Sequence, residues 1–528
     1  MSADTSAANN SSIQSEHHTS ERVLSYIQIF IRRLIARKPM GILQAEIDTR
    51  NELRRDLGRI QLLAIGLGAI IGAGIFVLSG QAAAKYSGPS VIISFVITGV
   101  IVFLSSLSFS ELGAMMPSSG SVYTYIYAAL GGIQSKSILI KDSFFLIHCR
   151  IFGVVYWMEF CATLSIRRFH SDSTIVQAPV AWDEDDGHFF VTGQVINLPA
   201  IAITIAITIL LIIRVHQMAR VNLVLVVFKI ITLLIFIFAC CNYVNRNNYN
   251  PFFPPNQGSF SEYGITGMLK ACTFVFFASV DFESVSTVAQ EAKSPERSLP
   301  IAIIGTTIIS SLLYVGVCTV MIGLVPYNLL DTDSPLAEAI KATPYGLWLS
   351  IIMNLGAITS CTTVVLTMML SQTRIFYAMA HDGVFCAVFS GIFPVDILGE
   401  TTSIGALITY IFVHITVIVM RYTHGDMQRV FQVPFGSWLV PIVGSLLCIL
   451  LMKGISKATG FRFLVWTALG QIIYFSYGFW HSKRRKLIRN KSNLIRIELL
   501  PTVSSVLEQY TQNELESNLT NEHTGNAV

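Results

Sequence analysis

The chain has 528 residues, of which 52% are hydrophobic and only 13% are charged. Average soluble proteins carry roughly 25% charged residues, so this composition excludes a soluble multidomain protein, a secreted scaffold, a disordered chain and a nucleic-acid binder. The formal net charge of +4, from 36 Lys and Arg against 32 Asp and Glu, is too small to indicate an acidic partner.

Long apolar runs follow one another along the chain, each close to the roughly 20 residues that a helix needs to cross a bilayer. Backbone polar groups in lipid must be satisfied within their own segment, so we expect these runs to be helices. The predicted spans are 61–83, 89–109, 143–165, 197–213, 221–241, 267–287, 300–325, 346–380, 402–420, 434–452 and 461–480. The predicted fold class is an all-α polytopic membrane protein.

The placement of basic residues predicts which ends of the spans face the cytosol. A basic stretch that ends at Lys38 precedes the first span, and the run from Lys483 to Lys486 follows the last one. The polar loops at 166–193 and 242–266 lack basic clusters, which is typical of the opposite side. The predicted organisation of this multi-pass protein, in the plasma membrane or a vacuolar or other internal membrane, is a cytosolic tail at 1–59, a membrane domain at 60–481 and a cytosolic tail at 482–528.

The nine cysteines lie almost entirely inside apolar runs, with no Cys-x-x-Cys pair and no Cys/His ligand spacing. They are predicted to be small packing residues, so neither a metal nor another cofactor is expected. Nucleophile–base pairs do not stand out either, and we do not expect an enzyme.

Four glycines, Gly66, Gly68, Gly72 and Gly74, lie in the middle of the first predicted span. Small residues four positions apart, such as Gly68 and Gly72, allow helices to pack closely. Alternatively the helix is broken, because each glycine lowers the helical preference by about 1 kcal/mol and a break frees N–H groups that can hold a carboxylate. Unwound backbone at membrane depth is tolerated where it lines a cavity, so a break predicts a substrate site.

Two carboxylates, Asp281 and Glu283, interrupt the sixth predicted span. A protein built from inverted repeats has a second broken helix in the corresponding place of its other half. An acidic residue inside a span costs about 2.5–3.5 kcal/mol on insertion scales and marks a functional site by default. The alternative is that both acids lie in water at the end of the span.

Lys229 lies about two turns inside the fifth predicted span. One interpretation is that its side chain extends along the helix until the ammonium reaches the cytosolic surface. The other is a role in proton or ion coupling, because a desolvated lysine changes its protonation state readily.

The chain contains a series of motifs: Leu57-Gly58, the run from Gly68 to Phe76, Ser110-Glu111-Leu112 to Gly120-Ser121, Asn197-Leu198-Pro199-Ala200, Ala219 to Lys229, Glu291 to Arg297, Gln372 to Met379, Asp382-Gly383 and Phe431 to Phe435. Together these motifs cover most of residues 50–485. They resemble the amino acid/polyamine/organocation superfamily, most closely its cationic amino acid transporter branch.

The resemblance implies two inverted five-helix repeats followed by two further helices, with about 11–12 membrane helices. It also implies that the first-span break receives the carboxylate of an amino acid through N–H groups, and that the sixth-span break receives its α-amino group through carbonyl groups. Lys229 matches the lysine that stands in place of sodium in proton-coupled relatives. The implied substrate-binding residues are Ile71, Gly72, Ala73, Gly74, Ile75, Phe277, Ala278, Ser279, Asp281, Phe282 and Glu283.

The chain departs from the family pattern at the sixth-span break, where Gly-Phe-Asp or Gly-Phe-Glu is usual and this chain has Asp281-Phe282-Glu283. The missing glycine removes the backbone freedom that makes unwinding inexpensive. The extra carboxylate, in contrast, favours a substrate with a cationic side chain. Both interpretations stay open at this point.

Two further segments depart from the family pattern. Residues 131–170 hold seven charged residues where relatives have a nearly charge-free third helix. These residues form a divergent helix, or they are the product of an altered reading frame or a retained intron. We favour the second interpretation. Residues 383–395 offer thirteen positions for a ninth helix, too few for a full span, so 383–399 forms a short or re-entrant span or the chain is incomplete.

These patterns predict a secondary amino acid transporter that works by alternating access. Its expected partners are an amino acid, cationic or one of a broad range, together with a proton and the lipid bilayer, and no nucleic acid. The alternative is a non-transporting amino acid sensor or an inactive or incomplete permease, as the two unusual segments would suggest.

Overall fold

The computed structural model describes residues 55–72, 74–130, 180–182, 189–191, 206–211, 215–256, 258, 262–332, 334–381, 395–427, 429–436, 438–455 and a few positions between 459 and 468. The chain divides into two compact units, Met1–Ala378 with Val388–Gln471, and Met379–Ala387 with Ile472–Val528. Nearly all of the described residues belong to the first unit, which contains every contact discussed below.

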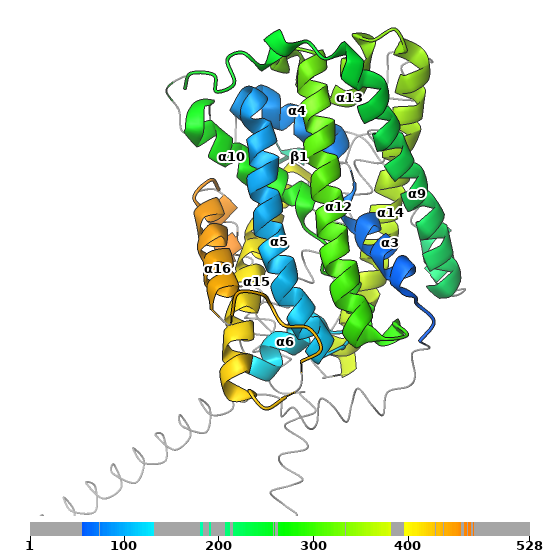
Figure 1. The fold of residues 1–528 in the computed structure, drawn as a ribbon, viewed down its shortest axis with the longest axis vertical. Coiled ribbons are helices and arrows are strands. Elements are labelled where there is room, and N and C mark those ends of the chain that lie inside the picture. Colours follow the sequence, from blue (N-terminus) through cyan, green and yellow to red (C-terminus); the bar gives the residue numbers. More distant parts are fainter. Residues whose placement is uncertain are drawn as a thin grey trace, which may run out of the picture. The chain divides into compact units, whose positions relative to one another are not determined.

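Helices account for most of the described residues (Figure 1). The α-helices are α3 (Arg59–Ile70), α4 (Ser79–Ala82), α5 (Val91–Met115), α6 (Val122–Ala129), α9 (Val215–Cys240), α10 (Gly264–Phe276), α11 (Ser284–Thr287), α12 (Pro295–Leu324), α13 (Pro335–Lys341), α14 (Gly346–His381), α15 (Val395–Thr423) and α16 (Leu439–Met452). The π-helical turns are η1 (Gly74–Leu78) and η2 (Ala83–Ser87). The 3₁₀ turns are η3 (Gly88–Ser90), η4 (Cys241–Tyr243), η5 (Arg246–Tyr249), η6 (Phe277–Ser279), η7 (Ala289–Glu291) and η8 (Tyr327–Leu330).

Strands occur in one short pair, within the polar loop predicted at 166–193. Strand β1 (Val180–Trp182) pairs antiparallel with β2 (Phe189–Val191), with Ala181 opposite Phe190. In the part of the chain that the structure describes, this pair is small beside the helices, so the all-α fold class is confirmed.

Six helical segments of the described residues are long and apolar enough to cross a membrane. They are Gly74–Met115, His216–Tyr243, Gly264–Thr287, Pro295–Leu324, Gly346–Ile375 and Ser403–Thr423, and two shorter apolar helices are Arg59–Ile70 and Leu439–Met452. The predicted span at 143–165, most of those at 197–213 and 461–480, and the shortened segment at 382–394 lie outside the described residues. The number of spans, the nature of 131–170 and the two inverted repeats therefore stay predictions.

Helices α5 and α12 lie side by side at the centre of this unit (Figure 1). Small and hydroxylated side chains line their contact: Thr307 donates a hydrogen bond to Ser106 at 3.2 Å, and a Cβ built on Gly99 would lie 3.0 Å from Ser311 Oγ. Small residues let helix backbones approach closely in a membrane, where lipid supplies no hydrophobic force between helices. The pair forms a frame against which α3 and α10 pack.

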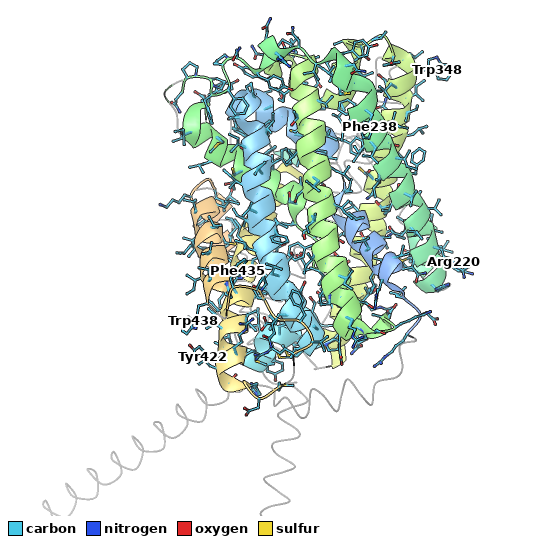
Figure 2. All side chains as sticks on the ribbon, viewed as in Figure 1. Arg220, Phe238, Trp348, Tyr422, Phe435 and Trp438 are labelled. Atoms are coloured by element: carbon cyan, nitrogen blue, oxygen red, sulfur yellow. The ribbon has the colours of Figure 1, made fainter. Side chains whose placement is uncertain are left out.

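Bulky apolar side chains cover the outer faces of the helices (Figure 2). Phe238 is 70% exposed and Trp348 is 78% exposed, while Tyr422 and Trp438 contact each other with ring centroids 5.3 Å apart. In the view of Figure 2, Tyr422 and Trp438 lie toward the opposite end of the helices from Trp348. Exposed aromatic side chains near both ends of apolar helices are typical of a membrane-spanning protein. The chain is a multi-pass integral membrane protein.

Candidate functional site

The first predicted span is not one continuous helix. Helix α3 ends at Ile70, Ile71 takes the extended conformation with φ −76° and ψ 91°, and helical structure resumes at Gly74. Ala73, one of the predicted site residues, lies outside the described residues. The break falls within the run of glycines, as predicted, because glycine gives up helical structure at little cost.

The glycines before the break have a different role, which is close packing. A Cβ built on Gly66 would lie 2.4 Å from Thr306 Oγ1 of α12, and one on Gly68 would lie 2.7 Å from Asn222 Oδ1 of α9. Real Cβ contacts do not come so close, so a larger residue would separate α3 from both neighbours. The glycine run thus contains both close packing and a helix break, each at different members of it, and the substrate site at the break stays a prediction.

The sixth span is also interrupted. Helix α10 ends at Phe276 and is followed by the 3₁₀ turn η6, and α11 begins at Ser284. Between them Asp281 has φ +78°, in the left-handed region that favours glycine. The helix is thus interrupted here without the glycine that is usual in the family. Aspartate tolerates positive φ better than most residues, and here it takes that conformation.

The two breaks contact each other. A Cβ built on Gly74 would lie 2.3 Å from Ala278 Cβ and 2.8 Å from Ala278 Cα, so only glycine fits at this approach of η1 to η6. Tyr314 of α12 joins them from one side, with its hydroxyl 2.8 Å from the carbonyl oxygen of Ile70 and 3.0 Å from that of Ala278. Carbonyl groups that the breaks leave without helical partners are thereby satisfied.

Lys229 of α9 binds the end of α3. Its side chain is fully buried, and Nζ donates to the carbonyl oxygens of Gly68 at 3.2 Å and Ile71 at 2.7 Å and to Thr363 Oγ1 of α14 at 2.7 Å. An ammonium group has three donors and no acceptor, so these partners fill it. The interpretation that Lys229 extends to the cytosolic surface is therefore wrong. Its charge caps the negative C-terminal end of α3.

The two carboxylates of the sixth span have different surroundings. Glu283 is partly exposed, and its Oε2 accepts a hydrogen bond from the Tyr410 hydroxyl of α15 at 3.0 Å. Asp281 is 7% exposed, and its Oδ1 is buried without a hydrogen-bond partner among the described residues. The side chain between them, Phe282, packs its ring 5.1 Å from that of Phe109 and 5.3 Å from that of Tyr410. The acids do not lie at a span end in open water.

The predicted site residues thus come together from two helices. Ile71, Gly72, Gly74 and Ile75 form the first break and its continuation, and all four are buried. Phe277, Ala278, Ser279, Asp281, Phe282 and Glu283 form the second break, in which Phe277 and Glu283 are partly exposed. The two breaks meet, and substrate binding by these residues stays a prediction.

Sequence reasoning did not single out Tyr314, Thr363 and Tyr410, which contact the breaks or the charged groups beside them. Each places a hydroxyl group in an otherwise apolar predicted span. That is a usable signal, because a polar group inside a membrane needs a partner. It is a weak one here, since serine and threonine occur throughout these helices and most bond to their own backbone, as Thr362 does to Ile358.

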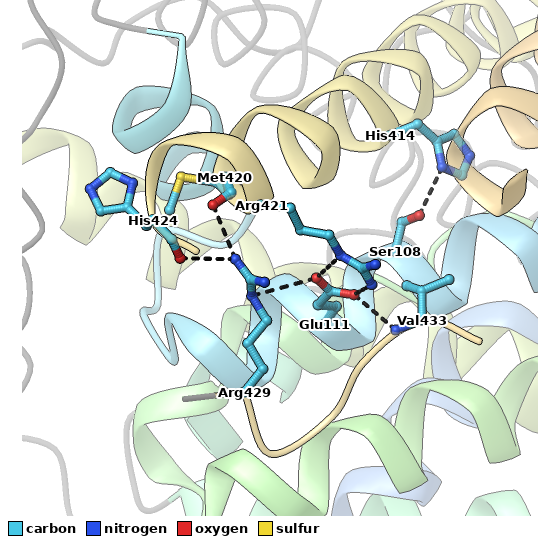
Figure 3. Close-up of polar contacts among 8 residues, drawn as sticks. All are labelled: Ser108, Glu111, His414, Met420, Arg421, His424, Arg429 and Val433. Carbon is cyan, nitrogen blue, oxygen red and sulfur yellow. Dashed lines mark hydrogen bonds and ion pairs between the residues drawn. The ribbon is translucent and has the colours of Figure 1, made fainter. Parts of the chain in front are cut away.

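A second charged group lies at the end of α5, within the motif Ser110-Glu111-Leu112 (Figure 3). Glu111 accepts hydrogen bonds from two guanidinium nitrogens of Arg421, lies 3.7 Å from Arg429 Nε, and accepts from the backbone N–H of Val433 at 2.8 Å. Arg429 also donates to the carbonyl oxygen of Met420 at 3.0 Å. This Glu111 cluster joins α5, α15 and the segment after α15.

An ion pair holds the segment after the sixth span. Glu291 Oε1 lies 2.6 Å from Arg374 Nη2 of α14. The backbone N–H of Leu57, ahead of α3, donates to the backbone carbonyl oxygen of Glu291 at 2.9 Å. Burial raises the pKa of the Glu291 carboxyl, and the Arg374 charge opposes this change. The pair thus ties the segments next to the two broken helices to one another and to α14.

Comparison with known proteins agrees with this geometry. A family model described as "Amino acid permease" matches residues 57–393, and one described as "C-terminus of AA_permease" matches residues 431–482. The branched-chain amino acid permease BcaP of Bacillus subtilis (strain 168) is 33% identical over 476 residues, which cover 85% of this chain and 98% of that protein.

Two other relatives show the breadth of the similarity. The methylthioribose transporter of the same bacterium is 30% identical, over 86% of this chain and 99% of that protein. The chloroplastic cationic amino acid transporter 9 of Arabidopsis thaliana is 31% identical, over 65% of this chain and 58% of that protein. Transporters named for substrates of different charge are thus all similar to this chain.

Proposed function

Because this chain belongs to the amino acid permease family, we propose that it is a secondary active transporter that moves amino acids together with protons by alternating access. Amino acid transport itself follows from the family, whose members are permeases and not enzymes. The proton, the range of substrates and the residues that bind them are the parts that we propose.

The meeting of the two breaks is the observation that carries the proposed site. Around Gly72 and Gly74 the backbone leaves the α-helical pattern, so N–H groups become available to a carboxylate. Across from them, the residues of η6 and of the turn that follows it offer carbonyl groups to an α-amino group. A zwitterionic amino acid head group has this pattern of charge, and irregular backbone at membrane depth is expected only where it serves such a purpose.

We propose that Lys229 is the residue that couples transport to protons. Lys229 Nζ has three oxygen partners, which match the three donors of an ammonium group. Loss of its proton would leave two donors for three acceptors and would weaken its hold on the end of α3. The protonation state of Lys229 would therefore favour one arrangement of the first break over another, which is what coupling requires.

Uptake by purified protein in liposomes tests this function. A panel of radiolabelled cationic and neutral amino acids is offered with and without an inward proton gradient. We expect uptake of at least one amino acid, with accumulation that increases with the gradient. Correctly inserted protein that binds amino acids but moves none would instead identify the non-transporting sensor.

A matched pair of lysine variants tests the coupling residue. Lys229→Met removes a buried charge with three hydrogen bonds, and we expect gradient-driven uptake to fall about tenfold or more. Lys453→Met removes a lysine from an exposed position and should leave uptake unchanged. Retention of the full gradient effect in Lys229→Met would exclude Lys229 as the coupling residue.

We also propose a substrate range that includes cationic amino acids. The relatives are named for branched-chain amino acids, for methylthioribose and for cationic amino acids, so similarity alone favours no single substrate class. The support for a cationic substrate is the pair of carboxylates, Asp281 and Glu283, beside the second break. The uptake panel described above decides between a cationic and a broad range.

A further inference from the structure

Asp281 combines two features that a purely structural residue would not need. Its φ of +78° is a conformation that glycine adopts without strain and that is unfavourable for most other residues. Its Oδ1 is buried and accepts no hydrogen bond from the described residues. Glycine at this position would give the same backbone without either disadvantage, so the carboxylate itself needs an explanation.

The surroundings of Asp281 include the groups that join the two breaks. Asp281 lies within electrostatic range of Tyr314, whose hydroxyl reaches the carbonyl oxygens of Ile70 and Ala278. It lies within the same range of Glu283 and of Tyr410, which donates to Glu283. Tyr314 and Tyr410 both have assigned acceptors, so neither hydroxyl satisfies the free oxygen of Asp281.

The second break holds two carboxyl groups, Asp281 and Glu283, and one amino group, that of Lys229, donates to the first break. The ammonium of Lys229 is fully used by α3 and Thr363 and donates to neither carboxylate. A negative charge left without a partner inside a membrane protein is costly, and a bound cation removes that cost.

We infer that Asp281 is a specificity-determining residue, which pairs with the second positive charge of a cationic amino acid and so selects such substrates over zwitterionic ones. This inference rests on the proposed function and adds to it the residue that distinguishes cationic from zwitterionic substrates. The side chain of a zwitterionic apolar amino acid has no donor for the buried Oδ1 of Asp281. The side-chain ammonium or guanidinium of a cationic amino acid supplies one.

Competition between two substrates of nearly equal shape tests this inference. Uptake of radiolabelled lysine by the wild-type protein in liposomes is measured against competing unlabelled norleucine, which replaces the side-chain ammonium with a methyl group, and the reverse experiment is also run. We expect the wild type to prefer lysine. We expect Asp281→Asn to reduce this preference about tenfold, because a charge-assisted pair is lost.

Two variants separate the charge of Asp281 from its backbone conformation. Asparagine tolerates positive φ and keeps the size of the side chain, and glycine supplies the same conformation with no side chain. Asp281→Asn and Asp281→Gly should therefore both fold, take up norleucine and lose the preference for lysine. Glu338→Gln, at an exposed pair with Lys341, removes an acid elsewhere and should leave the preference unchanged.

The outcomes that oppose the inference are distinct from failure of the proposed function. Uptake by Asp281→Asn with an unaltered preference for lysine would overturn the inference alone. So would a wild type that takes up norleucine as well as lysine while Asp281→Asn loses only the effect of external pH, because the occupant would then be a proton. If the wild type takes up no amino acid, the proposed function fails, and the inference fails with it.

Discussion

Two groups of charged side chains in the described helices differ in how completely their charges are paired. In the Glu111 cluster, one carboxylate receives hydrogen bonds from Arg421 and from the Val433 backbone and lies beside Arg429 (Figure 3). At the breaks, Glu283 has Tyr410 as its hydroxyl donor, and Asp281 keeps a buried oxygen without a partner. Within the described residues, one carboxylate is therefore closely paired, whereas the other has an oxygen without a hydrogen-bond donor.

This difference indicates which charged group stabilises the fold and which is available to bind a ligand. A buried carboxylate with its donors in place stabilises a specific packing of helices and has little capacity for anything else. An unpaired one gains most from a partner that arrives from outside. Variants of the two groups should accordingly affect different measurements, stability for the Glu111 cluster and transport for the breaks.

The largest expected effect is on stability, at the Glu111 cluster. Glu111→Ala leaves the largely buried charges of Arg421 and Arg429 without their partner, and we expect a loss of about 3–5 kcal/mol in the free energy of unfolding. Thermal unfolding of the purified protein in detergent measures it. The matched control is Glu338→Ala, which removes an exposed partner of Lys341 and should cost about 0–1 kcal/mol. Equal losses in the two variants would show that the Glu111 cluster is not a structural tie.

The next effect is at the contact between the breaks. Gly74→Ala places a Cβ 2.3 Å from Ala278 Cβ, and such overpacking typically costs about 1–3 kcal/mol. We expect uptake to be lost, because η1 and η6 must separate to make room. The double variant Gly74→Ala, Ala278→Gly should recover part of it. Gly405→Ala in α15, where a Cβ meets nothing within 4 Å, is the control. If Gly74→Ala transports as well as that control, the close approach is not required.

The smallest expected effect is the loss of a single tyrosine hydroxyl, and two tyrosines that both donate to backbone carbonyl groups are compared. Tyr314→Phe removes the hydroxyl between Ile70 and Ala278, and Tyr249→Phe removes one that donates to the Thr319 carbonyl oxygen at 2.8 Å. Each should cost about 0.5–1.5 kcal/mol of stability. Only Tyr314→Phe should also lower uptake several-fold, because only its hydroxyl joins the breaks. A similar decrease in uptake for both variants would assign Tyr314 a structural role alone.

The sequence predicts the helices well where hydrophobicity alone decides them. The span predicted at 346–380 is α14 at Gly346–His381, and that at 300–325 is α12 at Pro295–Leu324. The span predicted at 89–109 extends to Met115, because the cost of including Glu111 is offset by Arg421 and Arg429. Those arginines lie more than 300 positions further along the chain, and no local pattern connects them to Glu111.

The breaks are predicted with more difficulty, and for a physical reason. The glycine run marks the first break, and the acids mark the second, but the positive φ of Asp281 could not be anticipated from a position that lacks glycine. The partners of Lys229 and Glu283 come from α3, α14 and α15. Their choice depends on how helices far apart in sequence pack, which hydrophobicity and spacing do not specify.

Protection of one introduced cysteine by substrate tests whether the meeting of the two breaks is the transport site. Ser279→Cys is nearly isosteric, and Ser279 lies at the end of η6 next to the contact of Gly74 with Ala278. The exposed native thiol of Cys241 provides an internal reference within the same molecule. Peptide-resolved alkylation is followed with and without a transported amino acid. We predict that the amino acid slows alkylation at position 279 and leaves Cys241 unchanged, whereas equal rates at position 279 with and without the amino acid would contradict a site at the two breaks.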